Sequence, residues 1–520
     1  MFGRRTSEPQ AVPQISGFWC PIQQQLQLEP AEQSLAPDAS VSLEFGREIR
    51  EPIRSRMLYA FQVFAAIYGY RYENANPGAA TLRCIYGDAA ERGTSPYALY
   101  IPALYRARDE RDHSADGQTI RYAGESMFLF FGTDTATERP DWLGEIFEWL
   151  SSSYEANSTV RDSAGRIPYS ASVMSERGLS PRKPYANMIM AWLQNALVGR
   201  ISHEALPAAP SPIPGAAHLV VCSHDIDFYR SNRRATLVRL FKNLAVAGLL
   251  YRSWPFFWSN LARIPAAMGG RRAGDFLPAL FAAGKEHNFQ STLFVVARHS
   301  HRRDPDYSLE DLAARLKEAT AAGFTVDLHG TYLSIIENSD LAAEAETLEQ
   351  CTGTKVRGGR QHWLRFDRHQ KLFECIERAG FAFDSSLGFS DVAGFRSAAS
   401  FAFPPYDFGN ERPHTFLEIP LVIMDGNLEA TARVTREDPL KIANEILAES
   451  RKYGWGGVSV LWHNPMETLS VPRDINNVFW QCLQNKAQFD ERWITAEQLL
   501  SASIHRYHDA GLLKGISADA

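Results

Sequence analysis

The chain has 520 residues, of which 45% are hydrophobic and 22% charged, and its formal net charge is −6. This composition is that of an ordinary soluble globular protein with two or three domains, and it gives no indication of a nucleic-acid partner. Its six cysteines include no CxxC pair, which argues against a thiolate zinc site and a disulfide framework and favours a reducing compartment.

The N-terminal stretch, residues 1–50, is rich in Pro, Gln and Ser, and we expect it to be a partly disordered tail. It contains neither an apolar export-signal core nor a small-residue cleavage site. No run of about 18 uncharged apolar residues occurs, so no spanning helix is expected. The expected location is the cytoplasm, and the alternative is attachment to the periphery of the inner membrane from the cytoplasmic side.

Residues 51–205 are predicted to form an accessory α+β domain. Apolar spacing there predicts helices and one strand: helices at 56–70, 141–155 and 187–198, and a strand at 97–104. Four prolines between 206 and 217 predict a linker.

From residue 218 to 505, apolar strand-like runs alternate with helical segments. The runs lie at 218–223, 291–297, 324–330, 381–389, 416–425 and 457–464. Helices are predicted at 308–323, capped by Ser308 and ended by Gly323, and at 367–380, with a C-terminal tail at 506–520. The alternation predicts βαβ units around a parallel sheet, whose sites form at the carboxyl ends of the strands.

Histidines and aspartates recur where these runs end. They are Asp225, Asp227, His299, His301, Asp304, Asp327, His329, His362, Asp384, Asp391, Asp425 and His463. Such residues are the ligands of divalent metals and the commonest general acids and bases. A single one at a strand end is more often structural, but their recurrence indicates a catalytic or metal site.

Five short motifs contain strand-end residues from this set: "SHDID", "LHGTY", "RQHW", "DSS" and "LWHN". In this order they resemble the motifs of polysaccharide deacetylases, the NodB-homology domain. The resemblance covers about residues 215–505. It implies a distorted (β/α)7 barrel that removes N- or O-acetyl groups from saccharides with a bound divalent metal, zinc being the expected ion. A segment near 141–168 also resembles an uncharacterised domain found upstream of such barrels.

The resemblance implies a role for each matching residue. Asp225 corresponds to the base, Arg360 to the arginine that orients it, and His463 to the acid that protonates the leaving group. Asp227 and His329 correspond to metal ligands. Trp462, Asp384 and Trp363 are the expected substrate contacts.

One position departs from the family pattern, which places a second histidine four residues after His329. Leu333 stands there. His362, His299 and His301 are the candidates for the missing ligand, and His362 is preferred because it lies in the third motif. If none reaches the metal, the chain is a degenerate barrel.

The stretch 228–274 carries nine Lys or Arg residues, no Asp or Glu, and the aromatic run "WPFFW". A cationic, aromatic-rich amphipathic insertion is typical of peripheral membrane contact. The alternative is a helical pair packed on the N-terminal domain with its arginines in solvent. Membrane contact would suit a lipid-linked saccharide substrate in exopolysaccharide biosynthesis.

The resulting hypothesis is a metal-dependent carbohydrate deacetylase, a hydrolase of amide or ester bonds, with a saccharide as partner and no nucleic acid. The alternatives are a non-catalytic carbohydrate-binding or scaffolding barrel and another hydrolase of non-peptide C–N bonds. The identity of the sugar, the choice between N- and O-acetyl groups and the oligomeric state stay open at this point.

Overall fold

The computed structural model describes most of the chain. The described ranges are 39–74, 81–87, 98–106, 117–155, 158–199, 206–229, 233–251, 254–268, 275–305, 307–336, 340–464 and 473–513. Residues 1–38, most of the predicted N-terminal tail, lie outside them, and so does 514–520 at the C-terminus. Among the described residues, no helix combines the length and the apolarity that crossing a bilayer requires.

The N-terminal part contains a four-stranded parallel sheet in the order β2-β1-β3-β4. Its strands are β1 (Ser40–Phe45), β2 (Arg71–Tyr72), β3 (Leu82–Gly87) and β4 (Ala98–Pro102). An antiparallel hairpin follows, made of β5 (Gln118–Tyr122) and β6 (Glu125–Leu129). The predicted strand at 97–104 is confirmed as β4, whereas β1 lies inside the stretch expected to be a tail.

Four helices accompany these strands. They are α1 (Ile53–Tyr68), α2 (Trp142–Ser151), α3 (Val173–Glu176) and α4 (Tyr185–Leu197), and the 3₁₀ turns η4 (Ser153–Glu155) and η5 (Tyr169–Ala171) lie between them. The three predicted helices are confirmed as α1, α2 and α4. Helix α2 begins where the Asp141 carboxylate accepts a hydrogen bond from Gly144 N at 2.8 Å, which satisfies a free N–H of the first turn.

The second sheet is parallel throughout, in the order β14-β11-β10-β9-β8-β7-β16-β15, with β17 paired to the first half of β7. Its strands are β7 (His218–Asp225), β8 (Thr292–Val295), β9 (Thr325–Gly330), β10 (Gly358–Gln361), β11 (Phe383–Asp384), β14 (Leu417–Glu418), β15 (Leu421–Met424), β16 (Gly456–Leu461) and β17 (Glu491–Ile494). Every residue of β7 and β16 is buried, as expected for strands covered on both faces.

This sheet curls, because one short segment pairs with both of its ends. Strand β14 pairs with β11, and only Ile419 and Pro420 separate it from β15, which pairs with β16. Ile419 N donates to Asp384 O at 2.8 Å, and Pro420 O accepts from Ser459 N at 2.8 Å. Residues 417–424 therefore bridge the two ends of the strand order.

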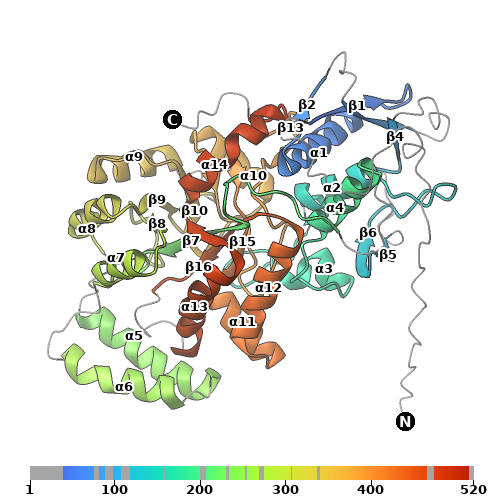
Figure 1. The fold of residues 1–520 in the computed structure, drawn as a ribbon. Coiled ribbons are helices and arrows are strands. Elements are labelled where there is room, and N and C mark those ends of the chain that lie inside the picture. The colour runs from blue at the N-terminus through green and yellow to red at the C-terminus, as the bar shows by residue number, and fades with distance from the viewer. Residues whose placement is uncertain are drawn as a thin grey trace, which may run out of the picture.

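Helices cover the outside of the curled sheet (Figure 1). They are α7 (Leu277–Glu286), α8 (Leu309–Ala321), α9 (Leu341–Thr352), α10 (His369–Arg378), α11 (Asp425–Thr435), α12 (Pro439–Tyr453), α13 (Arg473–Asn485) and α14 (Ala496–Asp509). The 3₁₀ turns η7 (His362–Leu364) and η8 (Lys486–Phe489) and the short pair β12 (Tyr406–Asp407) and β13 (Arg412–Pro413) complete this part. The predicted helices at 308–323 and 367–380 are confirmed as α8 and α10.

The N-terminal part packs directly on the curled sheet and its helices. Helix α1 lies against α14, and Tyr59 OH donates to Pro404 O at 2.8 Å. Trp455 Nε1 donates to Ile67 O at 3.3 Å, and one continuous apolar core includes both parts. The boundary at 206–217 stays a prediction.

A helical hairpin, made of α5 (Arg233–Val246), the π-helical turn η6 (Ala247–Tyr251) and α6 (Trp254–Met268), is inserted between β7 and α7. In Figure 1 it lies at the lower left, beside the body of the molecule.

Candidate active site

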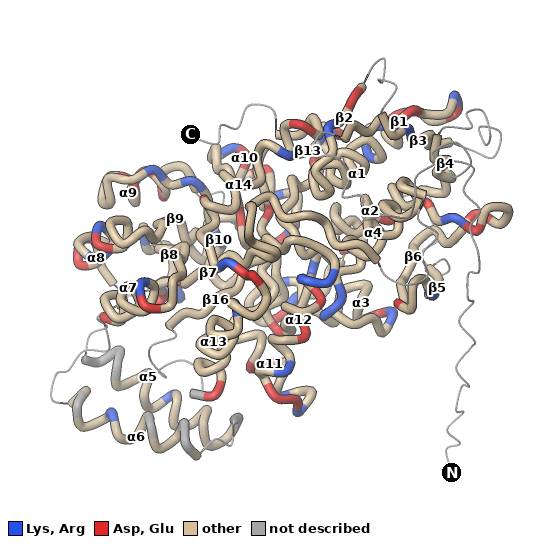
Figure 2. The backbone as a smooth tube through the Cα atoms, in the orientation of Figure 1, with Lys and Arg blue, Asp and Glu red and all other residues tan. Residues whose placement is uncertain are grey.

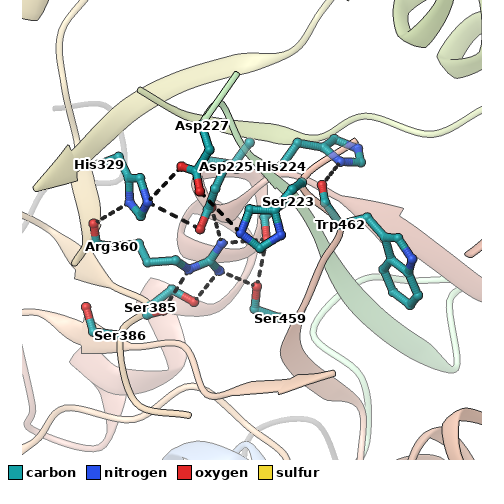
Figure 3. Close-up of polar contacts among 12 residues, drawn as sticks. Ser223, His224, Asp225, Asp227, His329, Arg360, Ser385, Ser386, Ser459 and Trp462 are labelled. Carbon is teal, nitrogen blue, oxygen red and sulfur yellow. Dashed lines mark hydrogen bonds and ion pairs between the residues drawn. The ribbon is translucent and has the colours of Figure 1, made fainter. Parts of the chain in front are cut away.

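The carboxyl ends of the central parallel strands bring the predicted residues together (Figure 3). Asp225 is the last residue of β7, and Asp227 follows two positions later. His329 lies near the end of β9, Arg360 lies in β10, and His463 comes two residues after β16. Because these strands are parallel neighbours, their ends meet at one edge of the sheet.

Arg360 is fully buried, and each of its N–H groups has an acceptor. Nη1 donates to Asp225 Oδ1 at 2.8 Å and to Ser223 Oγ at 2.9 Å. Nη2 donates to Ser385 Oγ at 2.9 Å and to Ser459 Oγ at 2.8 Å, and Nε donates to Ser385 O at 2.9 Å. A buried guanidinium with complete hydrogen bonding fixes the Asp225 carboxylate in one orientation.

The second oxygen of Asp225 faces the interior of the site. Asp225 Oδ2 lies 3.5 Å from His329 Nε2, and its side chain is almost fully buried. Arg360 thus holds one carboxylate oxygen and leaves the other directed towards the centre of the strand-end cluster.

Asp227, His329 and His362 form a group of donor atoms that could hold a metal ion. One ligand atom from each lies within 4.8 Å of the others. Asp227 Oδ1 is 3.6 Å from His329 Nε2 and 3.7 Å from His362 Nε2. Asp227 Oδ1 is also buried and accepts no hydrogen bond, which is costly for a carboxylate oxygen. Two imidazole nitrogens and one carboxylate are a donor set typical of catalytic zinc.

The outer nitrogens of both histidines are hydrogen-bonded to the protein. His329 Nδ1 donates to Arg360 O at 2.9 Å, and His362 Nδ1 donates to Asp304 Oδ1 at 3.2 Å. Both acceptors require the proton on Nδ1, so Nε2 of each neutral ring presents its lone pair towards Asp227. Metal-binding histidines are oriented in this way.

The pKa shifts of Asp227 and His362 indicate that the space between these two side chains favours positive charge. Burial alone would raise the pKa of Asp227, but the charges of His362, His463 and His329 hold it well below its usual range. Burial alone would lower the pKa of His362, but the carboxylates of Asp227 and Asp304 raise it to about 9. Burial lowers the pKa of His329. A divalent cation would supply the same positive charge at this position.

Asp304 is itself held rigidly in the loop after β8. Its Oδ2 accepts hydrogen bonds from Ser300 N at 2.8 Å and His301 N at 2.8 Å, and its Oδ1 accepts from Tyr332 N at 2.7 Å. These bonds orient the oxygen that receives His362 Nδ1.

His463 lies on the open side of the site and is paired with Asp425, the first residue of α11. His463 Nδ1 donates to Asp425 Oδ1 at 2.8 Å, and its backbone N donates to Asp425 Oδ2 at 3.0 Å. Its Nε2 is 3.6 Å from Asp227 Oδ2, and 22% of its side chain is exposed. Burial would lower the pKa of His463, but the charge of Asp425 and then that of Asp227 raise it to about 10.

The other candidate ligands lie outside the donor group. His299 Nε2 donates to Tyr307 O at 2.9 Å, and the His301 ring stacks on Tyr332 with centroids 4.8 Å apart. Leu333 lies in the turn after β9. The third member of the donor group is therefore His362, from the turn after β10.

Two of the expected substrate contacts are placed differently from the prediction. Asp384 is fully buried, and its carboxylate accepts from Ser386 N and Oγ, both at 3.0 Å. Trp462 is 1% exposed, and its Nε1 donates to Ile475 O at 3.3 Å. The resemblance assigns both side chains to substrate, and in the structure both are enclosed and hydrogen-bonded to the protein.

Trp363, in contrast, is 42% exposed beside His362. It adopts a left-handed backbone conformation, with φ 65°, which turns the chain sharply after β10. The Arg303 guanidinium lies 4.9 Å from its ring centroid, and Arg166 Nη1 donates to its carbonyl oxygen at 3.1 Å. An exposed indole at the edge of the site therefore has a defined position.

Sequence reasoning gave no role to several residues of the site. The serines around Arg360, Ser223, Ser385 and Ser459, sit inside or next to the recognised motifs and were not singled out. Asp304 and Asp425 were noted as strand-end aspartates, but a partner for each could not be assigned. The structure pairs Asp304 with His362 and Asp425 with His463, which are distant in the sequence.

A second group of possible ligands, Glu377, Asp407 and His414, lies away from this edge. Arg412 donates to both Glu377 oxygens at 2.9 and 2.8 Å, and His414 Nδ1 is 3.1 Å from Glu377 Oε2. A guanidinium already balances the carboxylate charge, so this group is an ion-pair cluster.

No protein-family model matches the sequence, and no curated protein matches it either. Solved structures do share features with it. A structure described as a putative polysaccharide deacetylase from Mycobacterium smegmatis is 17% identical, covers 59% of this chain and 96% of its own, and has a TM-score of 0.36. A polysaccharide deacetylase from Bacillus cereus is 11% identical over 54% of this chain and 91% of its own, with a TM-score of 0.28.

A peptidoglycan deacetylase from Bacillus subtilis is 10% identical, covers 56% of this chain and 95% of its own, and has a TM-score of 0.26. At such low identities and TM-scores, the likeness by itself assigns neither an activity nor a substrate.

Proposed function

We propose that this chain is a metal-dependent carbohydrate deacetylase that hydrolyses an N- or O-acetyl group on a saccharide. One observation carries the proposal: Asp225, held by Arg360, lies beside the donor group Asp227, His329 and His362, and the His463–Asp425 pair lies beside the same group. In this proposal the curled parallel sheet is the distorted (β/α)7 barrel expected from the motifs.

The donor group fits a divalent metal, and zinc is the proposed ion. Asp227, His329 and His362 would hold it, because their inner atoms converge and the outer nitrogens of both histidines are occupied. A bound zinc ion lowers the pKa of a water molecule towards ~7 and polarises a carbonyl group.

Asp225 is the proposed general base. The Arg360 guanidinium keeps it oriented, and Oδ2 remains available for the proton of the attacking water. Because Arg360 donates to Oδ1, Oδ2 can take up the proton while the hydrogen bond from Arg360 to Oδ1 remains in place.

His463 is the proposed general acid. The Asp425 carboxylate stabilises the imidazolium, so Nε2 carries a proton that can pass to the leaving amine or alcohol. Its partial exposure places that proton towards the open side of the site, where the leaving sugar has to depart.

The proposed saccharide contact is Trp363. Its exposed indole offers a rigid apolar face beside His362, held by Arg303 and Arg166. An aromatic face next to a polar centre is a common way of positioning a sugar ring while the acetyl group enters the site.

Acetate release tests the proposal. Purified protein is incubated with oligomers of N-acetylglucosamine and with O-acetylated xylan, and acetate is measured for the parent and for Asp225→Asn. We expect release from one class of substrate and its loss in the variant, which keeps the size of the side chain but removes the base. No acetate from either class, with a folded and metal-loaded parent, would favour a carbohydrate-binding barrel or another C–N hydrolase instead.

A further inference from the structure

Among the described residues, the helices of the hairpin 233–268 pack mainly on each other and on the turn η6 between them. Helices α5 and α6 pack on each other around a small apolar cluster of Leu237, Leu240, Ile264 and Ala267, which is separate from the main core. Asn243 Nδ2 donates to Asn260 Oδ1 at 3.0 Å and joins the two helices further. The hairpin is therefore built as a unit of its own (Figure 1).

The hairpin exposes more large hydrophobic side chains than the rest of the described surface does. Ten large hydrophobic side chains are exposed among the described residues, and six of them lie in this hairpin. They are Val238 (62% exposed), Phe241 (57%), Leu249 (84%), Trp254 (65%), Trp258 (58%) and Met268 (55%). Six exposed large apolar side chains gathered in one short hairpin indicate an interaction surface.

The exposed residues follow helical spacing. In α5, Val238 and Phe241 are three apart, next to the packed pair Leu237 and Leu240. In α6, Trp254 and Trp258 are four apart and lie on one face. Each helix thus has one stripe that contacts its partner helix and a second apolar stripe in contact with solvent.

The charge of the same segment has a single sign. Between Asp227 and Asp275 the sequence has nine Lys or Arg residues and no acidic residue, within a chain whose net charge is −6. Lys242 is exposed on α5, and Arg263 is half-buried on α6. In Figure 2 the described hairpin carries blue positions and no red one. The remaining seven side chains (Arg230, Arg233, Arg234, Arg239, Arg252, Arg271 and Arg272) lie outside those that the structure describes.

We propose that the hairpin 233–268 docks on an anionic lipid bilayer. Exposed tryptophans and aliphatic side chains enter the interface between headgroups and acyl chains, and lysines and arginines interact with anionic headgroups. A second copy of the chain fits less well, because two such hairpins would face each other with like charge. Nucleic acid gives no partner to aliphatic side chains such as Leu249.

The position of the hairpin connects docking to the edge of the sheet that carries the candidate site. The hairpin begins six residues after Asp227 and returns through α7 to β8. A docked hairpin holds the carboxyl ends of these strands near the bilayer. If the proposed deacetylation is right, on which this point rests, the substrate is a saccharide attached to a lipid anchor.

Vesicle co-sedimentation tests the docking without using activity. The probe is phosphatidylcholine vesicles in which about one third of the lipid is phosphatidylglycerol, with pure phosphatidylcholine vesicles for comparison. We expect binding to the anionic vesicles that weakens as salt is raised, and much weaker binding to the neutral ones. The double variant Trp254→Ser, Trp258→Ser should bind about tenfold more weakly, and Lys242→Glu should also weaken binding.

Leu249→Ser and Val434→Ser are a matched pair, because both replace an aliphatic side chain that is largely exposed, 84% and 78%, and only the first lies in the hairpin. Leu249→Ser should weaken binding and Val434→Ser should not. Asp225→Asn should bind vesicles like the parent, which separates docking from hydrolysis.

Three results would overturn docking. They are no binding to anionic vesicles at low salt, equal loss for Leu249→Ser and Val434→Ser, or a solution dimer that the tryptophan double variant dissociates.

Discussion

His362 Nε2 lies 3.7 Å from Asp227 Oδ1, while the opposite nitrogen of the same ring is bound by Asp304. The family pattern takes its second histidine ligand from the position of Leu333. Here a histidine of the third motif, His362, lies beside Asp227 instead. The ligand expected near His329 is therefore supplied from the neighbouring strand β10 and its following turn, in the account proposed here.

The support of His362 by Asp304 can be tested by Asp304→Asn. The amide is a weaker acceptor and no longer stabilises the positive charge on the ring, so zinc affinity should fall about 10- to 100-fold. Competition with a chromogenic chelator measures the affinity. His299→Gln is the control, since that ring is bonded to Tyr307 O outside the donor group, and it should leave the affinity unchanged. Equal affinities for the parent and Asp304→Asn, both folded, would contradict the role of Asp304.

Replacing the buried Arg360 should be among the most damaging changes in the sheet. Arg360→Lys cannot reproduce the bonds to Asp225, Ser385 and Ser459 from one ammonium group, and the free energy of unfolding should fall by about 4 kcal/mol. Ser459→Ala removes one acceptor and should cost about 2 kcal/mol. Urea unfolding measures both, and the exposed Arg298→Lys should change little. A loss below about 1 kcal/mol for Arg360→Lys would mean that the network is not rigid.

The role of His463 as an acid predicts dependence on the leaving group. His463→Ala should lower kcat on an N-acetyl sugar by about 10²- to 10⁴-fold, because the leaving amine needs a proton. An aryl acetate with a good leaving group does not, so its hydrolysis should fall far less. On the N-acetyl sugar, the kcat of Asp425→Asn should lie between that of the parent and that of His463→Ala. The same proportional loss on both substrates would exclude proton donation by His463.

The Glu377 cluster predicts a pH-dependent contribution to stability. Although burial alone would raise it, the pKa of Glu377 is lowered to about 2, chiefly by the hydrogen bonds of Arg412 and then by Thr415 N and His414. The unfolded carboxyl titrates near ~4.3, so the stabilisation is complete above that pH and disappears as the pH falls to about 2.

Glu377→Gln should therefore be less stable than the parent at neutral pH, and the difference should shrink between roughly pH 5 and 2. Thermal unfolding across this range measures it. The effect should be the same with and without a chelator, because Arg412 and not a metal balances the carboxylate; a chelator-sensitive difference would contradict the ion-pair interpretation.

The strands that carry the site were largely visible in the sequence. Parallel strands covered on both faces produce continuous apolar runs such as those of β7 and β16, and the polar residues after them necessarily share one edge. For this reason the sequence alone predicts that Asp225, Asp227 and His463 lie close together.

Strand β10 was not visible, because its sequence is "GGRQ" and has no apolar pattern. Its glycines reflect close packing: a Cβ on Gly358 would lie 2.5 Å from Phe383 O of β11. The burial of individual side chains could not be predicted from the sequence either. Asp384 ends β11 and Trp462 follows β16, and both are enclosed, whereas Trp363 is exposed.

The metal content of the purified protein decides whether Asp227, His329 and His362 hold an ion. Protein purified without chelator, parent and Asp227→Ala, is analysed for bound metals by mass spectrometry and for fold by circular dichroism. Asp227 supplies the carboxylate between the two histidines, so we expect about one divalent ion, zinc, per parent chain and a loss of most of it in the folded variant. A folded parent without stoichiometric metal, even after incubation with zinc, would exclude a metal site at these three residues.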